Sequence, residues 1–160
     1  MRVAFWRSAV LAMLVACGMT AGIAAAPSTG ALSAVRFELS TDGHILAAFT
    51  EMEIISSSVT LGEGSEPTIT TTRTVVLRRP LTRNREMAAW HELVILGDVV
   101  AARRSASLTM YGADGAPVAR FHLADAWPTK VEVTNVKVGN TTVLMETITM
   151  NCEYLQRISV

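Results

Sequence analysis

The sequence predicts a mainly β protein: an antiparallel β-sandwich or barrel of about seven strands with one packed α-helix at about residues 83–96. Three observations support this prediction. Several short runs alternate apolar and polar residues with the period of two expected of half-buried strands. Asp-Gly and similar turn signals separate these runs. One segment carries an apolar stripe at helical period.

The best-specified element is a long hairpin over residues 103–128. One face of its two runs carries Ala106, Leu108 and Met110, then Ala119, Phe121 and Leu123. Asp114-Gly115 supplies the positive-φ turn chemistry of a hairpin. Trp127-Pro128 is expected to close the hairpin, with the Trp127 ring packed near Trp90. Replacing either tryptophan by alanine is expected to cost on the order of 3 kcal/mol if the ring is buried.

Strands are also predicted before the hairpin. Residues 35–40 alternate and end at the turn Thr41-Asp42-Gly43. Residues 45–55 form a second apolar run, and the Thr- and Val-rich residues 68–79 are β-prone. Residues 56–67 contain two glycines, a proline and four serines, a composition that predicts a loop.

The predicted helix precedes the hairpin. Its stripe consists of Met87, Trp90, Leu93 and Val94. Thr82 or Asn84 is expected to cap its start. Gly97 follows its end, where a residue in the left-handed conformation is expected.

Two strands are predicted after the hairpin. Residues 130–138 form one, and a slip of the apolar phase at Thr134-Asn135 suggests a bulge. Residues 142–155 form the last strand, which carries apolar side chains on both faces. We therefore expect one face of it to lie on the core and the other against a neighbouring subunit.

The first 25 residues resemble a secretory signal, with Arg2 and Arg7 at the start, an apolar centre and small residues at the end. A membrane-spanning helix is the competing interpretation, but the second half is rich in Ala, Gly and Thr. Cleavage after Ala25 would leave a linker (26–34) and a β domain (35–160). Alternatively, Leu14-Val15-Ala16-Cys17 resembles a lipobox, in which case Cys17 would be lipidated. Either kind of signal predicts export to the periplasm, the cell surface or the medium. Contact with the membrane is then expected only through the signal or this lipid.

The chemistry of the mature chain indicates no enzyme. Cleavage removes two of 14 basic side chains and none of the 14 acidic ones, so the mature chain is mildly acidic, and no basic stripe predicts nucleic-acid binding. Cys152 is the remaining cysteine, and a buried inert thiol is expected. His91-Glu92 lacks the second histidine of a zinc-protease motif, and His44, His91 and His122 lie on three predicted elements. We predict no catalytic, metal or cofactor site.

Ordered motifs resemble the contractile phage tail tube family. Leu77-Arg78-Arg79-Pro80-Leu81-Thr82 followed by Trp90 is similar to its basic strand-to-helix segment, and Leu123 to Lys130 (LADAWPTK) to its "L-NAWP-K" segment. The resemblance covers nearly all of residues 35–155. The family-signature positions are Arg78, Thr82, Trp90, Asp114, Gly115, Trp127, Pro128 and Glu146.

The resemblance implies a β-sandwich subunit that forms six-membered rings stacked into a hollow tube, related to the tubes of type VI secretion and extracellular contractile injection systems. Its implied partners are copies of itself and sheath or baseplate proteins, and its implied location is a phage-tail-like particle. Three features depart from the family: Pro80 replaces a usual glycine, the preceding inter-subunit loop is altered, and an export signal is present. An exported adaptor of the same fold that does not polymerise is therefore the alternative. The polar face made by Ser105, Ser107, Thr109, Arg120 and His122 is expected to line a lumen or contact a subunit.

Overall fold

The computed structural model describes residues 30–62 and 69–160. The chain divides into two units, Met1–Ala31 and Leu32–Val160, and the described strands and helices lie in the second. They are β1 (Arg36–Thr41), β2 (His44–Phe49), β3 (Glu51–Leu61), β4 (Ile69–Pro80), α1 (Glu86–Ile95), α2 (Val99–Ala102), β5 (Arg104–Tyr111), β6 (Pro117–Val138), β7 (Thr141–Asn151) and β8 (Tyr154–Ile158). The predicted signal, Cys17 and most of the predicted linker lie outside the described residues. Within those residues, no helix is long and apolar enough to cross a membrane.

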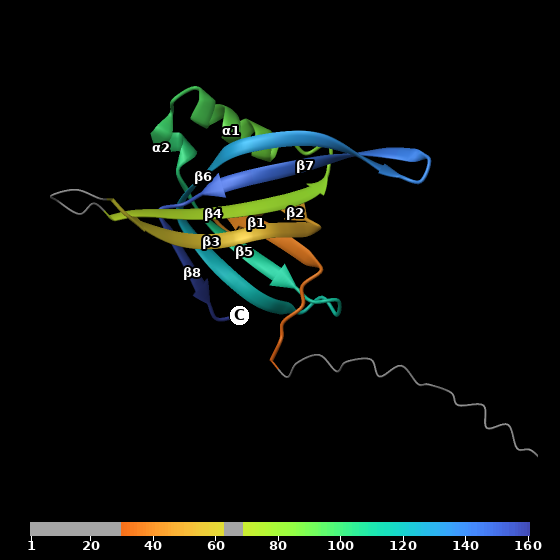
Figure 1. The fold of residues 1–160 in the computed structure, drawn as a ribbon, viewed down its shortest axis with the longest axis horizontal. Coiled ribbons are helices and arrows are strands. Elements are labelled where there is room, and N and C mark those ends of the chain that lie inside the picture. Colours follow the sequence, from red (N-terminus) through yellow and green to blue (C-terminus); the bar gives the residue numbers. More distant parts are fainter. Residues whose placement is uncertain (1–29, 63–68) are drawn as a thin grey trace, which may run out of the picture. The chain divides into compact units, whose positions relative to one another are not determined.

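The strands form one antiparallel sheet in the order β2-β1-β5-β6-β7-β4-β3, with β8 paired to β6 (Figure 1). The long strand β6 belongs to both halves of this sheet. Its residues 117–126 pair with β5, and its residues 127–138 pair with β7. Side chains from both halves join a single buried cluster, so the sheet folds over at β6 as a sandwich. The predicted mainly β class is confirmed, with eight described strands and two helices.

The core lies between the two halves and under α1. Its fully buried side chains include Leu39, Phe49, Val75, Leu77, Met87, Trp90, Leu108, Leu123, Ile148 and Met150. The alternation predicted for the hairpin is confirmed, because Ala106, Leu108 and Met110 are buried on one face of β5. Burying each large aliphatic side chain contributes about 1.5–3 kcal/mol, so these facing rows hold the two halves together.

Two predicted turns are confirmed by backbone conformation. Asp42 and Gly43 both have positive φ angles, 49° and 78°, between β1 and β2. Gly115 has a φ of 79° between β5 and β6, and the Asp114 carboxylate accepts a hydrogen bond from the Ala116 amide at 3.0 Å. Aspartate and glycine tolerate the left-handed region better than other residues.

The expected closure of the hairpin at Trp127-Pro128 is wrong, because β6 continues through both residues to Val138. The residue before a proline favours an extended backbone, which extends the strand instead of ending it. Pro128 has no N–H to donate, and the pairing with β7 shifts register just after it, between Pro128 and Lys130. The bulge predicted at Thr134-Asn135 is also wrong, since pairing is continuous there.

Other boundaries also differ from the predictions. The predicted run 45–55 is divided between β2 and β3, and β3 continues to Leu61 through the serines predicted to lie in a loop. Ser56 and Ser58 pair with threonines of β4 and Ser57 pairs with Arg73, so cross-strand pairing outweighs the turn preference of these serines. The predicted last strand, 142–155, is two strands, β7 and β8.

The predicted helix is confirmed as α1, which begins at Glu86. Asn84 accepts a hydrogen bond from the Glu86 amide at 2.9 Å, while Arg85 occupies the cap position. Gly97 has a φ of 79° just after the helix, as expected of a left-handed C-terminal residue. The short helix α2 was not predicted; Asp98 caps it by accepting from the Ala101 amide at 3.1 Å.

Candidate assembly surfaces

The family-signature positions serve several parts of the fold and do not converge on one site. Trp90 and Pro128 are fully buried, and Asp114 and Gly115 form the β5–β6 turn. Arg78 makes a partly exposed ion pair with Glu51 at 3.4 Å. The remaining positions, Thr82, Trp127 and Glu146, belong to the three arrangements that follow.

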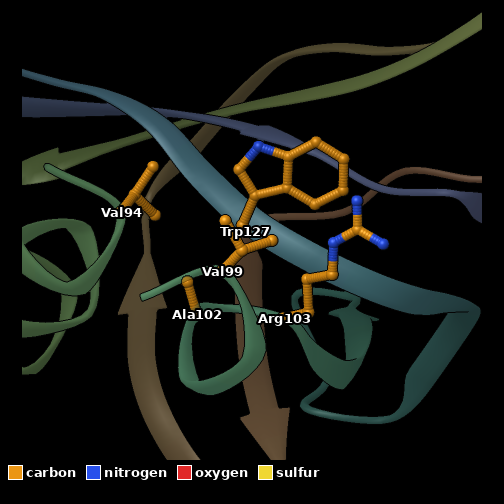
Figure 2. Close-up of a pocket in the computed structure, with 5 residues that line it drawn as sticks. All are labelled: Val94, Val99, Ala102, Arg103 and Trp127. Atoms are coloured by element: carbon orange, nitrogen blue, oxygen red, sulfur yellow. The ribbon is translucent and has the colours of Figure 1, made fainter. Parts of the chain in front are cut away.

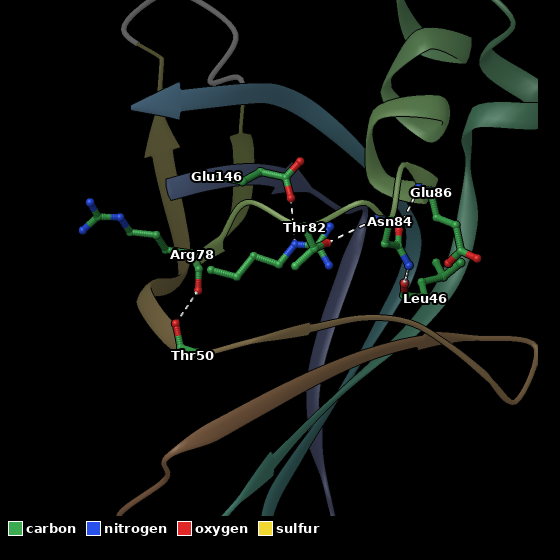
Figure 3. A network of polar contacts seen from close by, with 8 residues as sticks. Leu46, Thr50, Arg78, Thr82, Asn84, Glu86 and Glu146 are labelled. Atoms are coloured by element: carbon green, nitrogen blue, oxygen red, sulfur yellow. Dashed lines mark hydrogen bonds and ion pairs between the residues drawn. The ribbon is translucent and has the colours of Figure 1, made fainter. Parts of the chain in front are cut away.

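A buried ion pair joins β4 to β7. Arg79 Nε lies 2.7 Å from Glu146 Oε2, and both side chains are almost inaccessible to solvent (Figure 3). The Arg79 guanidinium also lies over the Phe49 ring, 5.2 Å from its centroid. Its Nη2 atom is buried without a hydrogen-bond partner among the described residues. A charge held this way depends on its partner, because an unpaired buried charge is strongly unfavourable.

Polar contacts also fix the segment between β4 and α1. Thr82 accepts a hydrogen bond from the Asn84 amide at 3.3 Å, and the Asn84 side chain donates to the Leu46 carbonyl at 3.2 Å (Figure 3). Asn84 therefore connects the start of α1 to the edge strand β2.

The two tryptophans differ in environment. Trp90 Nε1 donates to the Ala102 carbonyl at 2.6 Å in the core. Trp127 is half-buried beside α1 and α2, with the Arg103 guanidinium 5.2 Å from its ring centroid. The ring borders a hollow of about 190 Å³ that is lined by Val94, Val99, Ala102, Arg103 and Trp127 (Figure 2). Trp127 thus lies near the helix stripe as expected, at an open surface.

The helix ends beside this hollow present an unusual run of exposed aliphatic side chains. Ile95, Leu96, Val99 and Val100 are 71%, 75%, 55% and 89% exposed. We call these four residues the helix patch. Large exposed apolar side chains gathered in one short segment are candidates for an interaction site.

Two pairs of strands extend beyond the sandwich. Residues 56–61 of β3 and 69–72 of β4 are exposed on both faces, and so are most of residues 132–144 of β6 and β7. Figure 1 shows the β6–β7 ribbon projecting away from the rest of the sheet. Apolar side chains exposed on the ribbons include Val59, Leu61, Ile69, Val133, Val136, Val138 and Leu144. An isolated two-stranded ribbon is marginally stable in water, so both ribbons are candidates for contact with another chain.

The predicted polar face lies on β5 and β6. It borders a second hollow, of about 240 Å³, lined by Glu38, Ser40, Gly43, Ile45, Ser107, Thr109, Tyr111 and Arg120. Arg120 donates to the buried Thr109 hydroxyl at 3.3 Å. A hydrogen bond with Glu38 and partial burial raise the pKa of Tyr111. The residues that line this hollow are mostly polar, and they include no nucleophile paired with a base.

Potential metal and thiol chemistry is sparse in the described part of the chain. No group of three or more His, Cys, Asp or Glu side chains lies close enough there to hold a metal ion. Cys152 is buried at the end of β7, and burial raises the pKa of its thiol. A raised thiol pKa reduces the thiolate fraction and hence the reactivity.

Comparison with known proteins agrees with this architecture. The sequence profile of the T4-like virus tail tube protein gp19 family matches residues 33–156. No curated protein matches the chain. A chain in the cryo-EM structure of the anti-feeding prophage baseplate is similar in fold, with 15% identity, coverage of 84% of this chain and 99% of that chain, and a TM-score of 0.58.

Two further solved structures share the fold. A chain in the anti-feeding prophage tube-terminating cap is 10% identical, with coverage of 89% of this chain and 100% of that chain and a TM-score of 0.54. Hcp1 from Flavobacterium johnsoniae is 14% identical, with coverage of 76% and 93% and a TM-score of 0.51. The profile match spans most of the chain, and the chain therefore belongs to the T4-like virus tail tube protein gp19 family, as a structural tube subunit of a phage-tail-like system.

Proposed function

We propose that this protein assembles into six-membered rings that stack into a hollow tube. The observation that carries the proposal is the pair of ribbons, which expose apolar side chains on strands that have no layer beneath them. In a single copy these strands are only marginally stable, and contact with neighbouring copies would cover their apolar side chains. The helix patch is a third apolar surface on the same chain.

The edges of the sheet support the same proposal. The strand order leaves β2 and β3 at its ends, and β8 pairs with β6. Exposed edges invite uncontrolled pairing with other chains, and a closed ring removes that hazard. Because the exposed surfaces differ from one another, contacts between copies would be head-to-tail, the type that closes into rings.

Negative-stain electron microscopy of the purified protein tests this proposal. We expect annular particles, and short tubes at higher concentration. A protein that stays monomeric at high concentration would contradict the proposal and favour the alternative, an exported adaptor of the same fold that does not polymerise.

The partners and location follow from the same proposal. Solved structures of similar fold come from a prophage baseplate and from a sheath-tube complex of an extracellular contractile injection system. We infer that sheath-like or baseplate-like proteins contact the tube of this protein. We also infer export, from the signal-like residues 1–25.

The mass of the mature N-terminus tests the export proposal. Cleavage after Ala25 gives an unmodified chain that begins at Ala26. Lipidation would give a chain that begins at Cys17 with the added mass of acyl groups. A full-length chain that remains in the cytoplasm would contradict export in either form.

A further inference from the structure

We propose that the helix patch of one copy receives the β6–β7 ribbon of a neighbouring copy, through the ribbon face formed by Val133, Leu144 and Lys137. This contact rests on the proposed tube assembly and specifies one of its interfaces. It pairs two surfaces of the same chain that are both apolar, both exposed and unlike in shape.

Strand register places the three ribbon residues on one face. Val133 pairs with Glu146, Asn135 with Leu144, and Lys137 with Thr142, so these residues alternate together along β6 and β7. The face continues the core side of the sheet, because Glu146 and Ile148 on the same face of β7 are buried. Val133 and Leu144 are half-exposed where the core beneath them ends. These apolar side chains extend past the core of their own copy, so a layer from another copy could pack on them.

The helix patch offers such a layer. Its four aliphatic side chains surround the end of α1 and the start of α2, beside the hollow that Val94 and Trp127 line (Figure 2). In Figure 1 the far end of the β6–β7 ribbon lies across the unit from α2. One copy therefore cannot fold its ribbon tip onto its own patch, and the contact joins two copies.

The charges of the two surfaces are complementary. From Glu86 to Ala102 the helices carry Glu86, Glu92 and Asp98 and no lysine or arginine. Lys137 is the single charged side chain between Val133 and Leu144. Lys137 and Glu92 are exposed, and neither makes an ion pair within residues 30–62 and 69–160. A lysine beside an apolar ribbon and a glutamate beside an apolar patch favour this orientation over a contact between two patches.

Cross-linking of mixed single-cysteine variants tests the contact directly. Cys17→Ser and Cys152→Ala provide a background without native thiols, and Val133→Cys and Val100→Cys each add one exposed thiol to it. We expect a short bis-maleimide to cross-link an assembled mixture of the two variants, with little product from either variant alone. Cross-linking of Val100→Cys with itself would overturn the proposal, because it would mean that two patches meet.

A charge exchange provides the second test. Lys137→Glu and Glu92→Lys should each raise the concentration needed for assembly about tenfold, because like charges then face each other. The double variant should recover most of the loss. Lys130→Glu is the matched control, since Lys130 lies on the same strand outside the proposed face and already pairs with Glu132; it should assemble as the wild type does.

The outcomes of these tests distinguish a failure of the proposed contact from a failure of tube assembly. If the unmodified chain never assembles, the tube and the contact are both overturned. If it assembles but the mixture yields no cross-link and the double variant recovers nothing, the contact is wrong and the tube stands.

Discussion

At the scale of single residues, the Arg79–Glu146 pair is the most informative feature. Sequence reasoning singled out Glu146 only through the family resemblance and did not name Arg79 as a site residue. The signal was nevertheless present, because Arg79 shares its strand parity with the buried Val75 and Leu77. A basic residue in the apolar phase of a strand points inward and needs an acidic partner.

Replacing Glu146 should therefore lower the stability of the fold strongly. Glu146→Gln keeps the shape of the side chain but leaves Arg79 charged and buried, so the free energy of unfolding should fall by about 3–5 kcal/mol. Urea denaturation followed by tryptophan fluorescence measures this loss. The matched control is Glu51→Gln, in the more exposed pair with Arg78, which should cost less than about 1 kcal/mol. Equal losses in both variants would contradict the role assigned to the buried pair.

The two tryptophans should also differ in their effect on stability. Trp90→Ala removes a fully buried ring and its hydrogen bond to Ala102, so a loss of about 3–5 kcal/mol is expected. Trp127→Ala should cost less than half of that, because its ring borders an open hollow. Thermal denaturation of both variants compares the losses, and a Trp127→Ala loss as large as that of Trp90→Ala would show that the ring is fully covered.

At the scale of elements, the sequence predicted strands by alternation and turns by Asp-Gly chemistry, and both are largely confirmed. It did not predict that β6 is a single strand of 22 residues, because Trp127-Pro128 was interpreted as a boundary. It also did not predict the projecting ribbons. Alternation identifies a buried face only where a core lies beneath it, and residues 132–144 have exposed side chains on both faces.

Hydrogen exchange should report the state of the β6–β7 ribbon. A two-stranded ribbon without a covering layer opens readily, so amides of residues 133–144 should exchange much faster than those of β5 in a monomeric preparation. Assembly should slow the ribbon amides specifically. Slow exchange of the ribbon in the monomer would mean that the ribbon is stable without a partner.

Substitutions of Gly97 test whether the left-handed backbone conformation at the end of α1 matters for stability. Its φ is 79°, and a Cβ atom there would meet no atom of the described residues within 4 Å, so a side chain at this position is disfavoured by backbone strain. Gly97→Ala should lower the free energy of unfolding by about 1 kcal/mol. Gly97→Asn should cost less, because asparagine tolerates the left-handed region. The same urea denaturation compares the two, and an equal loss would indicate a cause other than backbone conformation.

At the scale of the whole molecule, the fold and the profile match identify a tail tube subunit, and the exposed ribbons support the proposal that neighbouring copies complete it. The predicted fold class could be reached from residue patterns, while the assembly surfaces required the structure, because they depend on which strands extend past the core. Helix-patch residues such as Val100 illustrate the difference: valine at this position was unremarkable in the sequence, yet it is 89% exposed in the fold.

Native mass spectrometry of the purified protein counts the subunits in each particle, so it shows whether this chain builds closed rings. We predict a dominant species with about six times the subunit mass, together with multiples of that mass from stacked rings. A distribution that contains only the monomer at high protein concentration would contradict ring formation.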